Sequence, residues 1–208
     1  MYVKVVEINH QNNKMQREGN KQKRKEETRK VLSICGLPGS GKTTAIKAIE
    51  DLGIVVTMGD VVRNEAKKRN LRPSPKNLGK IAKELRKKEG LAIIAEKCVD
   101  LIKNRQEEIV IVDGIRSLAE IEVFRKLWKF PIIAIIVDEK IRFKRLFERN
   151  RSDDPKSMED LQDRDRREIK FGLDKVLKKA DYIILNNTNI EDLKKKTREV
   201  VIDIIKNY

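Results

Sequence analysis

The sequence predicts an α/β domain in which helices cover both faces of a five-stranded parallel sheet. Segments with helical spacing separate five short apolar, β-branched segments, which predict strands at 31–35, 54–57, 109–112, 132–137 and 182–185. Such alternation favours a parallel sheet, because each right-handed crossover places a helix on one face. A chain of 208 residues can bury one such core, but not two large ones.

Helices are predicted from the 3.6-residue spacing of apolar side chains at 42–52, 60–69, 75–88, 91–105 and 190–206. Asn189 is the expected N-cap of the last helix, and Ser157 with Asp160 has the spacing of a capping box for the long helix before it. Three helical segments precede the third strand, more than one crossover needs. We therefore expect a small inserted subdomain over about 59–105.

Residues 1–30 form a charged extension with nine basic and four acidic side chains. They show no apolar periodicity, which predicts disorder, although residues 2–8 alternate weakly and an edge strand there stays open. Met15 is an alternative start. His10, the single histidine, is interpreted as a solvated surface residue.

The chain is basic, with 48 Lys and Arg against 33 Asp and Glu and a net charge of +15. This charge suits phosphate-bearing partners without choosing among them, and nucleic-acid binding through the basic extension is an alternative that we do not favour. No apolar run approaches the ~18 residues of a membrane span, and no signal-peptide core is visible, so we expect a cytoplasmic protein without a membrane partner. Cys35 and Cys98 fit neither a disulfide framework nor a metal site. The oligomeric state is left open.

A phosphate-binding loop is the clearest motif. Gly36-Leu37-Pro38-Gly39-Ser40-Gly41-Lys42-Thr43 fits G-x-x-x-x-G-K-[ST] between a predicted strand and a predicted helix, the context that the motif requires. Glycines let backbone N–H groups converge on phosphates, and a helix N-terminus favours an anion. We therefore predict a P-loop for ATP and Mg²⁺, with Lys42 as catalytic cation, Thr43 as metal ligand and Thr44 at the nucleotide.

Asp113 follows the apolar segment 109–112, where a strand of a parallel sheet would deliver a carboxylate to the P-loop. It is the predicted second Mg²⁺ residue. Motor ATPases and helicases place a glutamate next to activate water, whereas Gly114 follows here. The usual hydrolytic base is therefore absent at that position, which favours an acceptor other than water.

Two further segments resemble adenylate kinases. Gly59-Asp60-Val61-Val62-Arg63 is similar to the Gly-Asp-Met-Leu-Arg signature of that family, whose arginine holds the acceptor phosphate. Asp113-Gly114-Ile115-Arg116 resembles its Asp-Gly-Phe-Pro-Arg signature with one residue missing. The resemblance implies that the acceptor is bound by Gly59, Asp60, Arg63 and Arg116.

The resemblance continues downstream. Arg145 and Arg149 share a helical face, and Arg151-Ser152-Asp153-Asp154 with Arg164 is similar to the lid region of adenylate kinases. A single residue separates Arg149 from Arg151, where that family carries a lid domain, so a minimal lid is expected over about 149–164. The resemblance implies catalytic roles for Arg149, Arg151 and Arg164 and a nucleotide contact for Arg145.

The alternative to a site role for arginines on these helices is that they form a solvent-exposed face. It stays open for Arg145 and Arg149, and it is the interpretation that we prefer for Arg142, Arg166 and Arg167.

Over residues 31–208 the chain resembles an archaeal adenylate-kinase-like P-loop family of UPF-type proteins, mostly of unassigned substrate, and also dephospho-coenzyme A kinase. The resemblance implies transfer of the ATP γ-phosphoryl to a phosphate-bearing small molecule, with a nucleoside monophosphate as the expected acceptor. A dephospho-coenzyme A kinase and a P-loop NTPase acting with nucleic acid are the alternatives. The sequence does not choose between ATP and GTP as donor.

Overall fold

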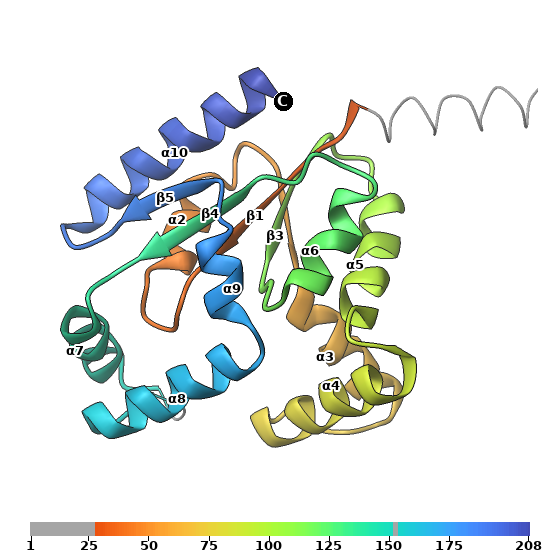
Figure 1. Cartoon of the computed structure of the whole chain (residues 1–208), viewed down its shortest axis with the longest axis horizontal. Coiled ribbons are helices and arrows are strands. Elements are labelled where there is room, and N and C mark those ends of the chain that lie inside the picture. The colour runs from red at the N-terminus through yellow and green to blue at the C-terminus, as the bar shows by residue number, and fades with distance from the viewer. Residues whose placement is uncertain (1–27, 152–153) are drawn as a thin grey trace, which may run out of the picture.

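The computed structural model describes residues 28–151 and 154–208 (Figure 1). The expectations for residues 2–8, His10 and Met15 lie outside the described residues. None of the helices in residues 28–151 and 154–208 combines the length with the apolar character of a membrane-spanning helix.

The sheet has five strands, all paired in parallel, in the order β2-β3-β1-β4-β5. The predicted five-stranded parallel sheet is thus confirmed, and β1 lies at its centre between β3 and β4. Each strand lies within one residue of its predicted bounds: β1 (Lys30–Cys35), β2 (Ile54–Thr57), β3 (Ile109–Asp113), β4 (Ile132–Ile136) and β5 (Tyr182–Leu185).

Nine helices alternate with these strands in the described residues: α2 (Lys42–Lys47), α3 (Met58–Lys68), α4 (Pro75–Glu89), α5 (Ile93–Lys103), α6 (Leu118–Arg125), α7 (Glu139–Arg149), α8 (Met158–Lys170), α9 (Leu173–Lys178) and α10 (Ile190–Asn207). Asn189 caps α10 and Ser157 forms a capping box with Asp160 on α8, both as predicted. The helix expected over 42–52 is wrong in length. It ends at Lys47, because the next N–H groups bond to carbonyls three residues back and form turns.

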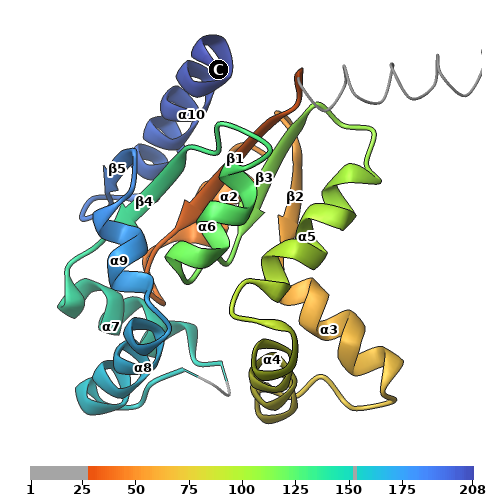
Figure 2. The same ribbon diagram turned by 45° about the vertical axis from the view of Figure 1, so that its right-hand side comes forward.

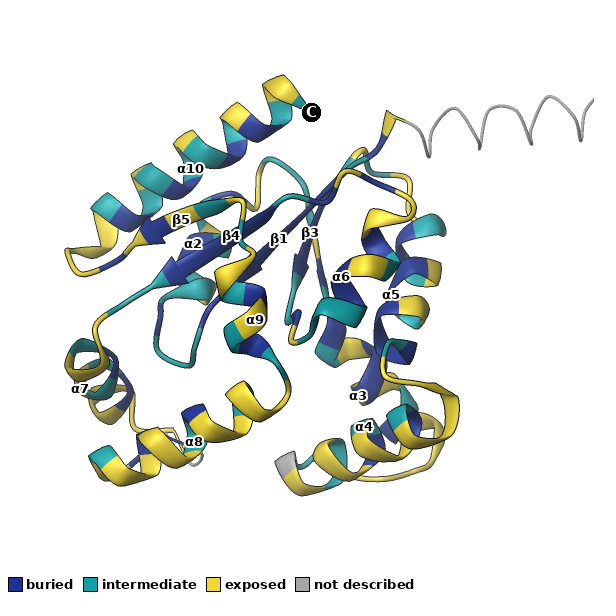
Figure 3. Cartoon of the chain, viewed as in Figure 1, coloured by how far each residue is buried: buried dark blue, intermediate teal, exposed yellow. Residues whose placement is uncertain are grey.

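Helices cover both faces of the sheet, as predicted (Figures 1 and 2). On one face, α2 and α10 bury Ala45, Leu193 and Val201 against alternate strand residues such as Ile34 and Ile133. On the other face, α3, α5, α6 and α9 pack against the intervening strand positions. Because both faces are covered, the central strands are buried along their length (Figure 3).

Three helices connect β2 to β3. Of these, α5 packs against β2 and α6, as a crossover helix does, whereas α4 contacts α3 and α5. The extra helix beyond an ordinary crossover is therefore α4, which packs on α3 and α5. Helices α3 and α4 lie at the same end of the molecule as α7 and α8 (Figures 1 and 2).

The folded domain begins before the predicted boundary at residue 30. Arg29, which was assigned to the extension, is 1% exposed and donates hydrogen bonds to the carbonyls of Ile102, Arg105 and Glu107. Lys30 is the first residue of β1. The guanidinium satisfies carbonyls at the end of α5 and just beyond it, where a helix has no partners of its own. Composition alone does not reveal this tertiary contact.

Candidate active site

The loop from Gly36 to Gly41 joins β1 to α2 and is confined by neighbouring elements. Gly39 (φ 79°) and Gly41 (φ 100°) adopt left-handed conformations. A Cβ atom on Gly39 would lie 2.9 Å from Leu146 Cγ, and one on Gly41 would lie 2.5 Å from Asn186 Nδ2. Only glycine fits these positions, so the loop backbone is set by α7 and by the segment after β5.

Lys42 folds back over this loop. Its Nζ donates to the carbonyl oxygens of Gly36 at 2.7 Å and Leu37 at 3.2 Å. Burial lowers the pKa of Lys42, while the negative charges of Asp113 and Glu168 oppose this shift. The ammonium group therefore lies at the mouth of the loop, within electrostatic reach of two carboxylates.

Asp113 ends β3 beside the first residues of the loop, since it pairs with Ile34 of β1. Its Oδ1 atom is buried and has no hydrogen-bond partner in the described part of the chain. Burial raises the pKa of Asp113, and the charges of Lys42 and Arg116 oppose that rise. An unpartnered buried carboxylate oxygen at this edge fits a residue that orients a hydrated cation.

The donor types at this edge also fit Mg²⁺, since Thr43 offers a hydroxyl oxygen and Asp113 a carboxylate oxygen. Mg²⁺ is usually held by one or two protein oxygens together with substrate phosphates. Thr43 and Asp113 are suited to that shared coordination.

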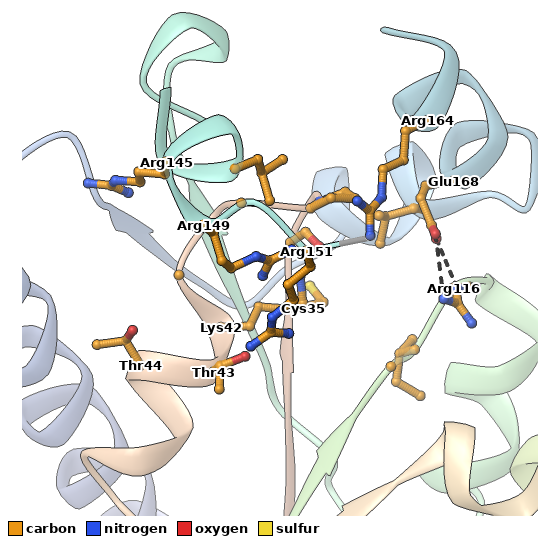
Figure 4. A pocket seen from close by; sticks show the side chains of 18 residues that line it. Cys35, Lys42, Thr43, Thr44, Arg116, Arg145, Arg149, Arg151, Arg164 and Glu168 are labelled. Atoms are coloured by element: carbon orange, nitrogen blue, oxygen red, sulfur yellow. Dashed lines mark hydrogen bonds and ion pairs between the residues drawn. The ribbon is translucent and has the colours of Figure 1, made fainter. Parts of the chain in front are cut away.

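A cavity of about 500 Å³ opens over the loop. It brings together most of the predicted site residues, from the loop, the turn after β3, α7 and α8 (Figure 4). Its predicted lining residues are Gly36, Pro38, Gly39, Gly41, Lys42, Thr43, Thr44, Arg116, Arg145, Arg149, Arg151 and Arg164.

Six predicted residues do not line this cavity. Leu37 and Ser40 line a separate space of about 30 Å³ near β4. Asp113 lies at the end of β3, where it pairs with Ile34 of β1. Asp60 and Arg63 form an exposed ion pair at 2.6 Å on α3, which also carries Gly59. The acceptor-binding residues implied by the resemblance are therefore split, with only Arg116 in the cavity.

Asp154, in the short connection between α7 and α8, holds arginines from both helices and from the connection itself. Arg149 donates to it from Nε at 2.9 Å and from Nη2 at 2.5 Å, Arg164 donates from Nη1 at 3.4 Å, and the backbone N–H of Arg151 donates at 3.0 Å. These hydrogen bonds lower the pKa of Asp154 to about 2, and those from Arg149 have the largest effect. The carboxylate therefore stays ionised and fixes the spacing of the Arg149 and Arg164 side chains, both of which are labelled in Figure 4.

The other two predicted arginines that line the cavity lie apart from that group. Arg116, in the turn after β3, forms an ion pair with Glu168 of α8 at 2.8 Å. Arg145 donates to the carbonyl of Thr188 at 3.2 Å and points away from the remaining arginines in Figure 4.

Two comparisons of the sequence place the chain. The family described as "AAA domain" matches residues 35–162, more than half of the chain. A "UPF0200 protein" of Methanosarcina mazei is 39% identical over 182 residues, which cover 86% of this chain and 95% of the relative. The chain belongs to the UPF0200 family. A longer "UPF0200/UPF0201 protein" of Archaeoglobus fulgidus is 44% identical, and this chain spans 57% of its length.

Solved structures resemble this UPF0200 protein in fold. TT1252 from Thermus thermophilus matches with a TM-score of 0.58 at 17% identity, over 84% of this chain and 97% of that one. The shikimate kinase of Acinetobacter baumannii, solved with shikimate, matches with a TM-score of 0.54 at 15% identity, over 89% and 98%. The UPF0200 chain therefore has a P-loop kinase-type fold.

The interpretation of Arg142 as a solvated surface residue is wrong. Arg142 is buried, with 4% exposure, and forms a double ion pair with Asp165 of α8, whereas Arg166 and Arg167 are exposed as predicted. Its Nη1 also donates to the carbonyl of Pro38 in the loop at 3.1 Å. Arg142 and Leu146 are four residues apart and both buried, so helical spacing from Leu146 is the signal that could have revealed it.

Two further side chains at the UPF0200 site were missed. Glu168 shares a face of α8 with Arg164, four residues earlier, and that spacing could have revealed it. Asn186 is buried after β5 and donates to the carbonyl of Ser40 at 2.8 Å. No sequence pattern links Asn186 to the loop, because the parallel sheet alone brings them together.

Asp154→Asn is expected to lower the free energy of unfolding by about 1–3 kcal/mol at pH 7, because Arg149 loses a charged partner. The lowered pKa of Asp154 means that its contribution is complete above the ordinary value of 3.8 and is lost as pH falls toward 2. Urea unfolding of wild type and variant from pH 7 to 2 should therefore converge at low pH. Asp163→Asn, in an exposed pair with Arg166, should change stability by less than about 0.5 kcal/mol. A difference at pH 2 as large as that at pH 7 would contradict this account.

Proposed function

We propose that the protein is an ATP- and Mg²⁺-dependent phosphotransferase whose acceptor is a phosphate-bearing small molecule, with a nucleoside monophosphate as first candidate. One observation carries the proposal: the P-loop and the arginines Arg116, Arg149, Arg151 and Arg164 line the same cavity. A hydrolytic P-loop protein needs a group that activates water, whereas a kinase needs cations that neutralise two phosphate-bearing ligands.

The donor half rests on the loop and the two adjacent strands. Backbone N–H groups of the glycine loop would hold the ATP phosphates, and Lys42 would leave the loop carbonyls to neutralise them. Thr43 and Asp113 would hold Mg²⁺, which supplies charge neutralisation between the phosphates when bound. The buried Asp113 oxygen without a partner supports this assignment.

The transfer half rests on the arginines. Arg149 and Arg164, spaced by Asp154, face the loop across the cavity, and each well-placed cation there would stabilise the transferring phosphoryl group. Arg116 would bind the acceptor phosphate, and its ion pair with Glu168 would break when the phosphate binds. Arg142 would keep its ion pair with Asp165 and support the loop through the Pro38 carbonyl, without contacting the substrates.

The deciding experiment is phosphoryl transfer from labelled ATP with Mg²⁺ to AMP, GMP, CMP, UMP, dephospho-coenzyme A and shikimate, the last as an acceptor without phosphate. We expect transfer to at least one phosphate-bearing acceptor, with hydrolysis in its absence at least tenfold slower. Transfer to shikimate alone would contradict the acceptor class. Hydrolysis at the same rate with and without every acceptor would contradict the kinase assignment and favour the NTPase alternative.

A further inference from the structure

A buried carboxylate on α6 controls the backbone from which Arg116 projects. Glu120 is 1% exposed, and its Oε2 accepts from the backbone N–H groups of Arg116 at 2.8 Å and Ser117 at 3.2 Å. Its Oε1 accepts from Arg86 Nη2 at 3.0 Å. A carboxylate can cap the start of a helix while it is exposed and has no cation beside it, so capping alone does not explain the burial of Glu120 or its pairing with Arg86. Burial makes Glu120 depend on its cation, because an unpaired buried charge is strongly unfavourable.

Arg86 reaches Glu120 from α4, the extra helix between β2 and β3. The Arg86 side chain is 15% exposed, and its guanidinium carbon lies 5.6 Å from the ring centroid of Phe171, directly after α8. One arginine therefore contacts the first turn of α6 and the end of α8. Such contacts over an aromatic ring are favourable for a cation.

The turn after α8 also packs on this backbone. A Cβ atom on Gly172 would lie 3.3 Å from the carbonyl oxygen of Arg116. Arg116 is therefore held at its N–H by Glu120 and closely approached at its carbonyl by the α8–α9 turn, while Glu168 holds its guanidinium. Residues of α6, of α8 and of the turn after α8 therefore contact Arg116 directly, and α4 supports it through Glu120.

We propose that Arg86 and Glu120 form a positioning pair that fixes Arg116 and so sets the affinity for the acceptor. Neither Arg86 nor Glu120 lines the cavity, so both act through Arg116. The inference rests on the proposed function, in which Arg116 binds the acceptor phosphate. A misplacement of about 1 Å in a binding group is enough to cost a large factor in rate.

The first test does not depend on the acceptor. Amide hydrogen exchange, resolved to single residues, is compared in wild type, Arg86→Gln and Arg198→Gln, which breaks an ion pair with Asp51 near the end of α2. We expect exchange of the Arg116 and Ser117 amides to accelerate about tenfold in Arg86→Gln, with most other amides within twofold. Arg198→Gln should leave those two amides unchanged. Unchanged exchange, or equal acceleration throughout the domain, would overturn the proposal.

The second test uses the acceptor that wild type phosphorylates fastest. Arg86→Gln and Glu120→Gln should each raise the acceptor KM about tenfold and leave the ATP KM within twofold, and the double variant should be no worse than either. Arg86→Lys, which retains the charge, should restore most of the affinity and decides the matter where Arg86→Gln fails to fold. Equal rises in both KM values would mean a general structural role. A wild type that phosphorylates no acceptor would remove the proposed function, while the exchange result would still decide whether Arg86 positions Arg116.

Discussion

Lys42→Ala is expected to reduce phosphoryl transfer by about 10³-fold or more. Removal of one well-placed transition-state donor costs about 10²–10³-fold in rate, and Lys42 is in addition the cation of the phosphate loop. Its ammonium lies 2.7 Å from the Gly36 carbonyl, at the mouth of the loop, and no other lysine lines the cavity in the described residues. Initial rates at saturating ATP and Mg²⁺, with the best acceptor from the panel, measure this loss.

A matched control is available on the same helix. Lys47 ends α2, is exposed and does not line the cavity, so Lys47→Ala should retain at least half of the wild-type rate. Both variants should unfold with similar midpoints, since neither lysine belongs to the core. A Lys42→Ala enzyme with more than a tenth of wild-type activity would remove Lys42 from the catalytic residues.

Asp165→Ala should produce the largest loss of stability, about 3–5 kcal/mol in the free energy of unfolding. Its partner Arg142 has a side chain that is 5% exposed, and the variant would leave that guanidinium without a carboxylate in the interior. Arg142 Nε already has no hydrogen-bond partner in the described part of the chain, so the carboxylate supplies most of its compensation. Urea unfolding monitored by circular dichroism measures the change.

The loop should respond as well, because Arg142 donates to the Pro38 carbonyl and its own carbonyl lies against Gly39. We expect ATP affinity to fall about tenfold in Asp165→Ala. Replacing both members with apolar residues, as in Arg142→Met with Asp165→Leu, should recover most of the stability but not the loop contact. Asp163→Ala, in the exposed pair next along α8, should cost less than about 1 kcal/mol. A loss below 1 kcal/mol in Asp165→Ala would show that the buried pair does not support α7 and α8.

The strands were predicted from sequence to within one residue because each is a short apolar, β-branched run. The central strands β1, β3 and β4 are buried on both faces, whereas the edge strands β2 and β5 are partly exposed. Helix lengths were less secure, as α2 shows, because the spacing of apolar residues continues through turns that α2 does not include. Cys35 and Cys98 are both buried, and burial raises the pKa of each thiol to about 12, which keeps both thiols protonated.

The phosphate loop needed no tertiary information, since its pattern of glycines, lysine and threonine is local and lies between a strand and a helix. The arginines did need it. Lys42, Thr43 and Asp113 are placed by one loop and one strand end. Arg142, by contrast, is buried because it meets Asp165 of α8, whereas Arg149 and Arg164 both meet Asp154 at the cavity. A charge pattern along a helix does not distinguish a buried pair from a solvated face.

The sequence by itself therefore determined the sheet, the position of the P-loop and the carboxylate beside it, because these depend on local periodicity and on the parallel connection between strands. Only the tertiary structure decided the partners of the buried arginines: Arg29 bonds to backbone carbonyls at the end of α5, while Arg142 pairs with Asp165 and Arg86 with Glu120. The physical reason is that the packing of helices decides which two charged side chains meet. Once buried there, each charge requires its partner, because an unpaired charge in the interior is strongly unfavourable.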